Sequence, residues 1–169
     1  MIYHKHLLVN AKVKSPMREE SVAIAFLQDL VDRIDMKIIK GPFASYVDKD
    51  GNKGLTAIVM IETSHIAFHI WDEVDPGHLQ LDLYTYGQLE LDQVLSIIKE
   101  SFDIVEMDFI LFDRENGFKW EIQGREADGV IWKSFNNNKD IKTNIDSNVI
   151  DFAKAEQDAI WATQQSFEE

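Results

Sequence analysis

The chain has 169 residues, 45% hydrophobic and 28% charged, and this length and composition predict one globular domain with a core of its own. It has no cysteine, which excludes disulfides, thiolate metal sites and a cysteine nucleophile. The 30 acidic and 17 basic residues give a net charge of −13, which argues against a nucleic-acid partner. No apolar run approaches the ~18 residues of a membrane span and no secretory pattern opens the chain, so we expect no membrane partner and a cytoplasmic location.

The N-terminal part of the sequence predicts a strand, a helix and a second strand. Residues 6–13 have a strand pattern. Ser15 and Pro16 then predict a helix start, as an N-cap followed by a first-turn proline, and apolar residues at helical spacing predict an amphipathic helix over residues 17–34. A strand pattern resumes over residues 36–46, and a polar loop follows it.

The next hydrophobic stretch, residues 55–71, is too long for one strand. At about 3.3 Å per residue it would span roughly 55 Å, about three times the usual strand length. Its one polar cluster is Glu62-Thr63-Ser64-His65, which lacks the Gly, Asn or Asp of an easy turn. We therefore expect the chain to bend or bulge there, with a hydroxyl residue in an unfavourable backbone conformation.

Two strand patterns, residues 64–71 and 79–86, flank a loop at residues 72–77. Alternate residues of the first strand form a core face, and the residues between them form a polar face. If the two strands pair, polar side chains of both surround one site. These side chains are His65, His69, Asp82, Tyr84 and Tyr86.

A second amphipathic helix over residues 89–101 and a strand over residues 104–112 complete the order β-α-β-β-β-β-α-β. This order predicts an α+β fold, a two-layer α/β sandwich with an antiparallel sheet and both helices on one face. We place the core domain at residues 1–112 and interpret residues 113–169 as a C-terminal extension packed on the same domain.

The extension carries its own turn and helix signals. Asn116-Gly117 and Asp128-Gly129 lie between strand-like residues and predict hairpins. Asp146 or Ser147 is a candidate cap for a last helix.

The polar residues of this sheet allow three interpretations. The histidines could simply be hydrogen-bonded on a half-buried sheet, or His65, His69, His78 and Glu73 could bind a metal ion. Alternatively, Ser64 at a strained bend could attack the preceding carbonyl group if a base takes its proton. Elimination of the resulting ester would cut the chain and leave a pyruvoyl group, which can bind a substrate amine and accept the electrons of a decarboxylation.

Two sequence motifs resemble those of the prokaryotic-type S-adenosylmethionine decarboxylases. The family motif Glu-Ser-His-x-x-x-His-x-Trp-Pro-Glu is similar to residues 62–73, Glu-Thr-Ser-His-Ile-Ala-Phe-His-Ile-Trp-Asp-Glu. The family motif Asp-[Leu/Ile]-Phe-Thr-Cys-Gly is similar to residues 82–87, Asp-Leu-Tyr-Thr-Tyr-Gly. The resemblance covers about residues 4–112 and agrees with an α/β sandwich.

The resemblance implies a self-processing, pyruvoyl-dependent decarboxylase that acts on S-adenosylmethionine or a related amino acid such as arginine or ornithine. Its pathway would be polyamine (spermidine) biosynthesis, and it would work as a homodimer without a metal ion. The zymogen would be cleaved between Thr63 and Ser64, and Ser64 would become the pyruvoyl cofactor. His69 matches the histidine that assists cleavage, and Thr56 stands where the family has a supporting serine.

The remaining matches concern the substrate. Glu73 matches the acid that holds the ribose hydroxyls, and we place Trp71 and His65 beside it as substrate-binding residues. Tyr86 stands at the position of the proton-donating cysteine, although a phenol has a pKa near ~10 and a thiol near ~8.5. Thr63 stands where the family has Glu. These departures leave a second interpretation open, an unprocessed relative that serves as a ligand-binding or regulatory module.

Overall fold

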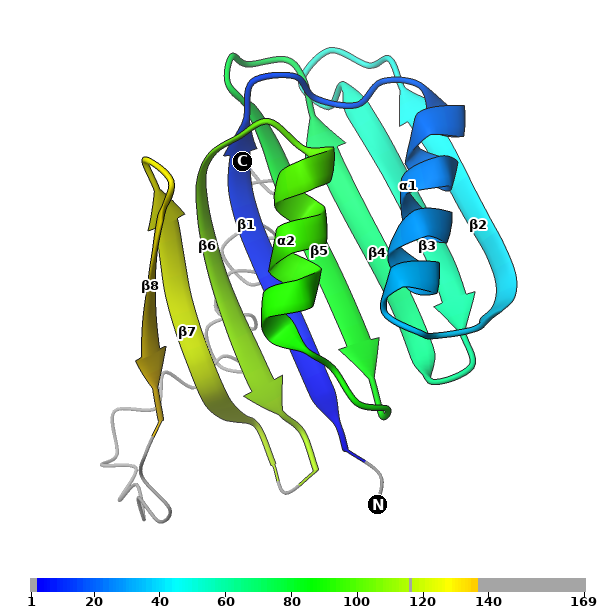
Figure 1. Ribbon diagram of the computed structural model, residues 1–169. Helices are drawn as coiled ribbons and strands as arrows, with labels where there is room; N and C mark the ends of the chain where they lie inside the picture. Colours follow the sequence, from blue (N-terminus) through cyan, green and yellow to red (C-terminus); the bar gives the residue numbers. More distant parts are fainter. Residues whose placement is uncertain (1–2, 116, 137–169) are drawn as a thin grey trace, which may run out of the picture. The chain divides into compact units, whose positions relative to one another are not determined.

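The computed structural model describes residues 3–115 and 117–136, which form one antiparallel sheet with two helices (Figure 1). In chain order the elements are β1 (Lys5–Val13), α1 (Glu20–Arg33), β2 (Ile38–Val47), β3 (Gly54–Ile61), β4 (Ser64–Trp71), β5 (Gly77–Thr85), α2 (Leu91–Ser101), β6 (Ile104–Asp113), β7 (Lys119–Ala127) and β8 (Val130–Phe135). The predicted α+β fold and the β-α-β-β-β-β-α-β order of its core are confirmed.

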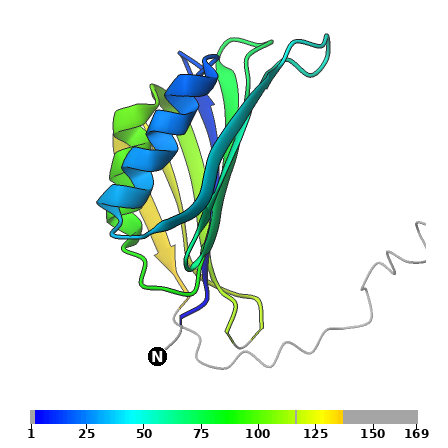
Figure 2. The ribbon, with the colours of Figure 1, turned by 90° about the vertical axis from the view of Figure 1, so that its right-hand side faces the viewer.

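The strand order in the sheet is β2-β3-β4-β5-β1-β6-β7-β8, and every neighbouring pair is antiparallel. The first strand of the chain therefore lies in the middle, between β5 and β6. Both helices cover the same face of the sheet, as Figure 2 shows. The other face carries no helix among the described residues, and we call it the open face.

The core lies between the helices and the sheet because each strand alternates apolar and polar residues. On β4, for example, Ile66, Phe68 and Ile70 are buried beneath the helices, while the residues between them face the open side. The rings of Phe26, Phe68 and Phe102 pack edge to face, with centroids 4.9 to 5.9 Å apart. This packing joins α1, β4 and the end of α2, and it fixes both helices over the centre of the sheet.

The long hydrophobic stretch is divided into two strands by a tight hairpin. β3 and β4 pair over their whole lengths, Ile61 lies opposite Ser64, and only Glu62 and Thr63 form the turn. Ser64 has φ = 134°, which lies in the region that L-residues rarely adopt. The expected hydroxyl residue with unfavourable backbone geometry is therefore Ser64, and the chain reverses direction there instead of only bending.

The start of α1 differs from the prediction. The helix begins at Glu20, five residues after Ser15, so Ser15 and Pro16 are not its cap and first turn. Pro16 instead lies against Gly77, and the Arg18 side chain pairs with Asp72 Oδ2 at 2.5 Å. These contacts join the segment before α1 to the β4–β5 connection.

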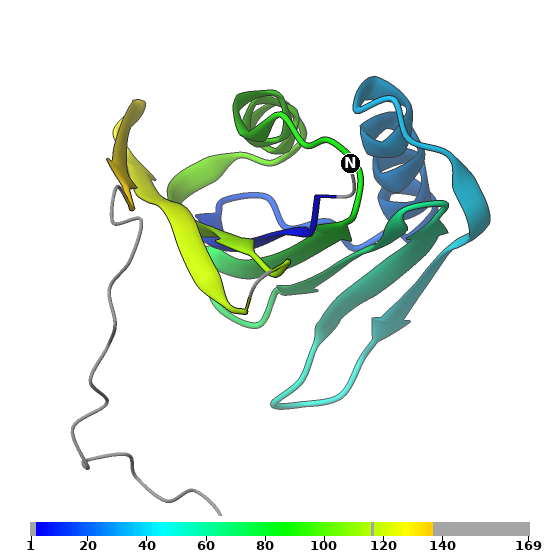
Figure 3. The same ribbon diagram turned by 90° about the horizontal axis from the view of Figure 1, so that it is seen from below.

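β7 and β8 continue the same sheet beyond β6. The predicted hairpin at Asp128-Gly129 is confirmed, with φ of 53° and 76° at its two turn residues. The pair curls toward the side of α2 (Figure 3), where Lys99 and Glu126 form an ion pair of 2.7 Å. The predicted last helix, with Asp146 or Ser147 as cap, lies outside the described residues, and the domain boundary after residue 112 stays a prediction.

Neither helix of the described part, α1 or α2, has the length and apolar character required to cross a lipid bilayer.

Candidate active site

Ser64 lies at the first position of β4, directly after the hairpin turn. Its hydroxyl Oγ is 3.0 Å from Nδ1 of His65, the next residue in the chain. Successive residues of a regular strand point to opposite faces, so these two side chains would ordinarily diverge. Ser64 has a positive φ, and its side chain does not follow this alternation. Its hydroxyl therefore lies beside an imidazole that can accept its proton.

The other nitrogen of His65 faces a carboxylate on the neighbouring strand. Nε2 is 3.3 Å from Asp82 Oδ1 on β5, and the His65 ring packs against the edge of Tyr84 with centroids 6.0 Å apart. Asp82 Oδ1 is buried and makes no hydrogen bond within the described residues. The contact with His65 therefore lacks hydrogen-bond geometry and is an ion pair only when the imidazole is protonated, and Asp82 keeps an acceptor turned toward the imidazole.

Asp82 is held in its ionised form by its surroundings. Burial, the largest single influence, raises the pKa of its carboxyl group, but His6 and His65 outweigh this effect. The hydrogen bond of 2.9 Å between His6 Nε2 and Asp82 Oδ2, followed by the charges that the two imidazoles carry when protonated, brings the pKa below its usual value. Ser64, His65 and Asp82 thus have the arrangement in which a hydroxyl can serve as a nucleophile, an imidazole as its base and a carboxylate as the group that orients the base.

Tyr86 contacts the hairpin turn through its backbone and its side chain. Its backbone N–H donates to the carbonyl oxygen of Thr63 at 3.1 Å, and its hydroxyl donates to the carbonyl oxygen of Glu62 at 2.6 Å. The Thr63 carbonyl is the group next to Ser64 that a serine hydroxyl could attack. A donor on its oxygen favours attack, because negative charge develops there.

Four other predicted site residues lie at the far end of the sheet. Thr56 and His69 face each other across β3 and β4, with 2.9 Å between Oγ1 and Nδ1. Trp71 stacks on His69 with centroids 5.8 Å apart, and Glu73 accepts a hydrogen bond of 2.7 Å from the backbone of Gly51.

Ser64 and His69 are separated by five residues of β4, about 16 Å at about 3.3 Å per residue. In Figure 1 the turn before β4 lies at the lower end of the sheet, and the loop after it lies at the upper end. We call the cluster of Ser64, His65, Asp82 and Tyr86 the lower site and the cluster of Thr56, His69, Trp71 and Glu73 the upper site. The sequence places them around one site, whereas the structure separates them within one chain.

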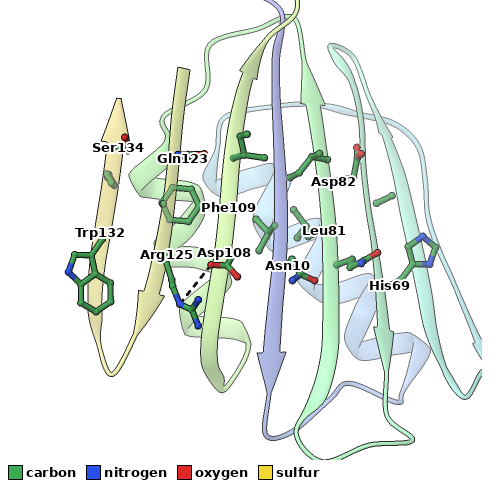
Figure 4. A pocket seen from close by; sticks show the side chains of 17 residues that line it. Asn10, His69, Leu81, Asp82, Asp108, Phe109, Gln123, Arg125, Trp132 and Ser134 are labelled. Atoms are coloured by element: carbon green, nitrogen blue, oxygen red, sulfur yellow. Dashed lines mark ion pairs between the residues drawn. The ribbon is translucent and has the colours of Figure 1, made fainter. Parts of the chain in front are cut away.

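A groove of about 860 Å³ opens on the open face beside both clusters. His69 and Asp82 line one side of it, and Arg125 and Trp132 of the β7–β8 pair line the other (Figure 4). Asp108 lies between them and pairs with Arg125 at 3.9 Å. Neither Ser64 nor His65 lines this groove, so it meets the lower site only through Asp82.

The metal interpretation gains no geometric support. Among residues 3–115 and 117–136, no three His, Asp or Glu side chains gather as they would around a metal ion. His65 and His69 are four residues apart on one strand, about 13 Å by the rise of a strand, which is too far for two ligands of one ion.

Two residues that adjoin the lower site are not identified by the sequence analysis. They are His6, which binds Asp82, and Arg114, whose guanidinium is 3.3 Å from the other ring nitrogen of His6. His6 lies on the polar face of β1, and His4 precedes that strand by one residue at the same alternation, which is a signal for His6. Arg114 follows the end of β6, and no sequence pattern connects it with a residue 108 positions earlier.

Comparison with known proteins adds an independent observation. The sequence model of a family described as S-adenosylmethionine decarboxylase matches residues 5–115. The chain is also similar to the S-adenosylmethionine decarboxylase proenzyme of Archaeoglobus fulgidus, with 25% identity over 105 residues. That alignment covers 60% of this chain and 88% of the relative. The matched region contains β1 to β6 and therefore both the lower and the upper site.

Proposed function

Because the chain belongs to the S-adenosylmethionine decarboxylase family, we propose that it is a self-processing, pyruvoyl-dependent decarboxylase of S-adenosylmethionine or a related amino acid. The observation that carries this proposal is Ser64, which has φ = 134° and a hydroxyl 3.0 Å from an imidazole nitrogen. Strain at this residue is relieved when its peptide bond is cut, so the native fold itself favours the reaction. With S-adenosylmethionine as substrate, the product would serve spermidine synthesis.

The self-cleavage begins with the Ser64 hydroxyl. His65 Nδ1 accepts its proton while Oγ bonds to the carbonyl carbon of Thr63, and the proton then passes to the nitrogen of Ser64 as the C–N bond breaks. The chain is now joined by an ester, and Ser64 carries a free amine. Removal of the Ser64 α-proton expels the Thr63 carboxylate and leaves an enamine. A proton added to its CH2 carbon converts it to an imine, and water then hydrolyses the imine to release ammonia and leave the pyruvoyl group.

Tyr86 would assist the first step through its backbone. The charge that develops on the Thr63 carbonyl oxygen falls on the atom that accepts the Tyr86 N–H, 3.1 Å away in the intact chain. Such a donor is already in place before the reaction, which is the condition for effective electrostatic stabilisation of a transition state. This contribution does not depend on which side chain residue 86 carries.

The surroundings of Ser64 suit a pyruvoyl group, which supplies a carbonyl that binds the substrate amine and accepts the electrons released with carbon dioxide. His65 would be available to exchange a proton at this position. Asp82 would keep the imidazole oriented through its free Oδ1. The phenol of Tyr86, 41% exposed and hydrogen-bonded to Glu62, stands at the edge of the same site.

The two separated clusters support a homodimer. If Thr56 and His69 act on Ser64, they must come from another copy of the chain, since within one chain about 16 Å separate His69 from Ser64. The open face carries exposed apolar residues, among them Leu8, Ile58 and Met60. Two copies packed with these faces together, and with their strands running in opposite directions, would bring each upper site over the partner's lower site.

The test is denaturing mass spectrometry of the purified wild-type chain during incubation at neutral pH. Two fragments are expected, the larger one beginning with a pyruvoyl group in place of Ser64. The Ser64→Ala variant is the matched control and should stay a single chain. A wild-type chain that stays intact at 19.5 kDa after prolonged incubation would overturn the proposal. Release of carbon dioxide from S-adenosylmethionine, arginine and ornithine by the cleaved protein then identifies the substrate.

One observation favours a second function, an unprocessed ligand-binding or regulatory relative. The Tyr86 hydroxyl, at the position of the family's proton-donating cysteine, donates its proton to the Glu62 carbonyl at 2.6 Å. A hydroxyl engaged in this hydrogen bond stabilises the turn and is not available to donate its proton to a substrate. An intact chain that binds S-adenosylmethionine in equilibrium dialysis without releasing carbon dioxide would support this function.

A further inference from the structure

We propose that Arg114 is a positioning residue for the self-cleavage, which acts through His6 and Asp82 to fix the direction of proton transfer from Ser64 to His65. The inference rests on the proposed function and extends it to residues outside both family motifs. Its basis is a continuous series of contacts that runs from the residue after β6 through β1 and β5 to β4. In order, the contacts join Arg114, His6, Asp82, His65 and Ser64.

Arg114 determines which nitrogen of His6 carries the proton. A guanidinium group only donates hydrogen bonds, so the ring nitrogen 3.3 Å from Arg114 Nη1, His6 Nδ1, must be the acceptor. The proton of the neutral ring is then on Nε2, which donates to Asp82 Oδ2 at 2.9 Å. One oxygen of Asp82 is therefore occupied, and the carboxylate stays in a fixed orientation.

The second oxygen of Asp82 determines in the same way which ring nitrogen of His65 carries the proton. Oδ1 is buried and makes no hydrogen bond within the described residues, and His65 Nε2 lies 3.3 Å from it. A buried acceptor of this kind favours the proton of His65 on Nε2, since an unsatisfied carboxylate oxygen is costly. His65 Nδ1 is then left with a lone pair, 3.0 Å from the Ser64 hydroxyl, and only the hydroxyl can donate.

Arg114 is itself well anchored. Its backbone N–H donates to the carbonyl oxygen of His4 at 2.8 Å, and its guanidinium lies 4.3 Å from the centroid of the Tyr84 ring and 5.3 Å from that of Phe118. The Tyr84 hydroxyl is in turn 2.7 Å from His4 Nδ1. These contacts hold the guanidinium over the sheet at the height of His6.

Ionisable groups around Ser64 come from three strands and from the residues beside them. His6 lies on β1 and His4 precedes it, β4 contributes His65, and β5 contributes Asp82 and Tyr84, while Arg114 follows β6. A guanidinium group has donors and no acceptor, so Arg114 fixes the direction of the hydrogen bonds from its end of the series.

The first measurement does not require cleavage. In the Ser64→Ala chain, long-range ¹H–¹⁵N NMR at neutral pH should show His6 with the proton on Nε2. In the double variant with Arg114→Met, the two tautomers of His6 should mix, and Arg114→Lys, which keeps a donor, should restore the single form. A His6 protonated on Nδ1, or one whose tautomer is unaffected by Arg114→Met, overturns the inference whether or not the wild type cleaves.

The second measurement is the rate of self-cleavage in the otherwise wild-type chain. A positioned general base accelerates a reaction by roughly 100-fold or more, and loss of its orientation should remove part of that effect. Arg114→Met should therefore slow cleavage about tenfold and change the pH–rate profile of cleavage. Arg114→Lys should recover most of the rate. Arg33→Met, which removes an ion pair of 2.8 Å with Glu100 between the helices, is the control for loss of an arginine and should cleave normally. Equal cleavage by wild type and Arg114→Met would overturn the inference and leave the proposed function intact, whereas a wild type that does not cleave contradicts the proposed function.

Discussion

The backbone N–H of Tyr86 donates to the carbonyl oxygen of Thr63 across 3.1 Å, and this hydrogen bond joins the end of β5 to the β3–β4 turn. Residue 86 therefore has two separate roles in the structure. Its backbone contacts the carbonyl group that Ser64 would attack, and its side chain contacts the preceding carbonyl group, that of Glu62. Substitution at position 86 can separate the two, because it leaves the backbone donor in place.

We expect Tyr86→Phe to cleave itself at close to the wild-type rate. The variant keeps the N–H that stabilises charge on Thr63 and loses only the hydroxyl bond to Glu62, which is worth about 0.5–1 kcal/mol at a partly exposed site. Urea unfolding of the two chains in their Ser64→Ala background should show that difference. A loss of cleavage larger than tenfold would mean that the hydroxyl itself takes part in the reaction.

We expect Tyr86→Cys to raise the decarboxylation of S-adenosylmethionine at least tenfold. The phenol proton is committed to Glu62, whereas a thiol at this position is smaller and has a pKa nearer neutrality, near ~8.5. The rate of carbon dioxide release by the cleaved protein is the measurement, with the fraction of cleaved chain determined in the same sample. If cleavage is complete and the rate does not rise, the shape of the substrate pocket limits the reaction and not the proton donor.

Ser64→Gly should be more stable than Ser64→Ala by about 1 kcal/mol, the reverse of the usual order in a strand. Both variants lack the nucleophile and stay intact, but glycine adopts φ = 134° without the steric cost that a Cβ imposes. Denaturant unfolding of the two variants measures the difference. The control is Ala67→Gly, within regular β4, in the Ser64→Ala background, where the chain that keeps alanine at position 67 should be the more stable one.

The contribution of Asp82 to stability should depend on pH. Its folded-state pKa is lowered, so the group stabilises the fold above its unfolded pKa and loses that effect as the pH falls through its folded value. The free energy of unfolding should therefore fall in Asp82→Asn relative to wild type at pH 6, and the two should converge below about pH 4. Asp108→Asn, on the same face of the sheet, is the control. A difference between Asp82→Asn and wild type that stays constant with pH would contradict this account.

A dimer with shared sites predicts complementation between two inactive chains. His69→Gln keeps Ser64 but loses the upper-site imidazole, and Ser64→Ala keeps the imidazole but lacks the nucleophile. Mixed after dissociation or produced together, the two should restore cleavage of the His69→Gln chain, which mass spectrometry distinguishes by mass. Cleavage of His69→Gln alone at the wild-type rate would show that the upper site has no part in processing.

Much of this fold could be predicted because its determinants are local. Alternating residues such as Leu7, Val9 and Ala11 mark a strand with one buried face, and helical spacing marks α1 and α2. The start of α1 could not be predicted in the same way. Ser15 and Pro16 have the chemistry of a helix start, but the segment that contains them joins the β4–β5 connection through the ion pair between Arg18 and Asp72, which are far apart in the sequence.

The candidate site was predictable in its position along the chain and less so in its contacts. A long apolar stretch with a single polar cluster predicts a bend at residues 62–65, but it does not predict that the chain reverses there or that Ser64 has the positive φ. The contact between His65 and Ser64 is not predictable from the sequence, because regular alternation would direct the two side chains to opposite faces. The positive φ of Ser64 accompanies the departure from that alternation. His6 and Arg114 depend on the order β5-β1-β6, which is set by long-range pairing.

The position of the β3–β4 turn also has a consequence for how the protein can be assembled. A break between Thr63 and Ser64 creates two chain ends, yet β3 keeps its ladder with β2 and with β4, and β4 keeps its ladder with β5. The strands of the sheet therefore stay paired after the cut, but the cut protein cannot refold by the same process as the intact chain. An intact chain folds in a unimolecular process, whereas two separated fragments must find each other by diffusion. Recovery from denaturation should accordingly become concentration-dependent once the chain is cut, so that folding has to come first and cleavage second.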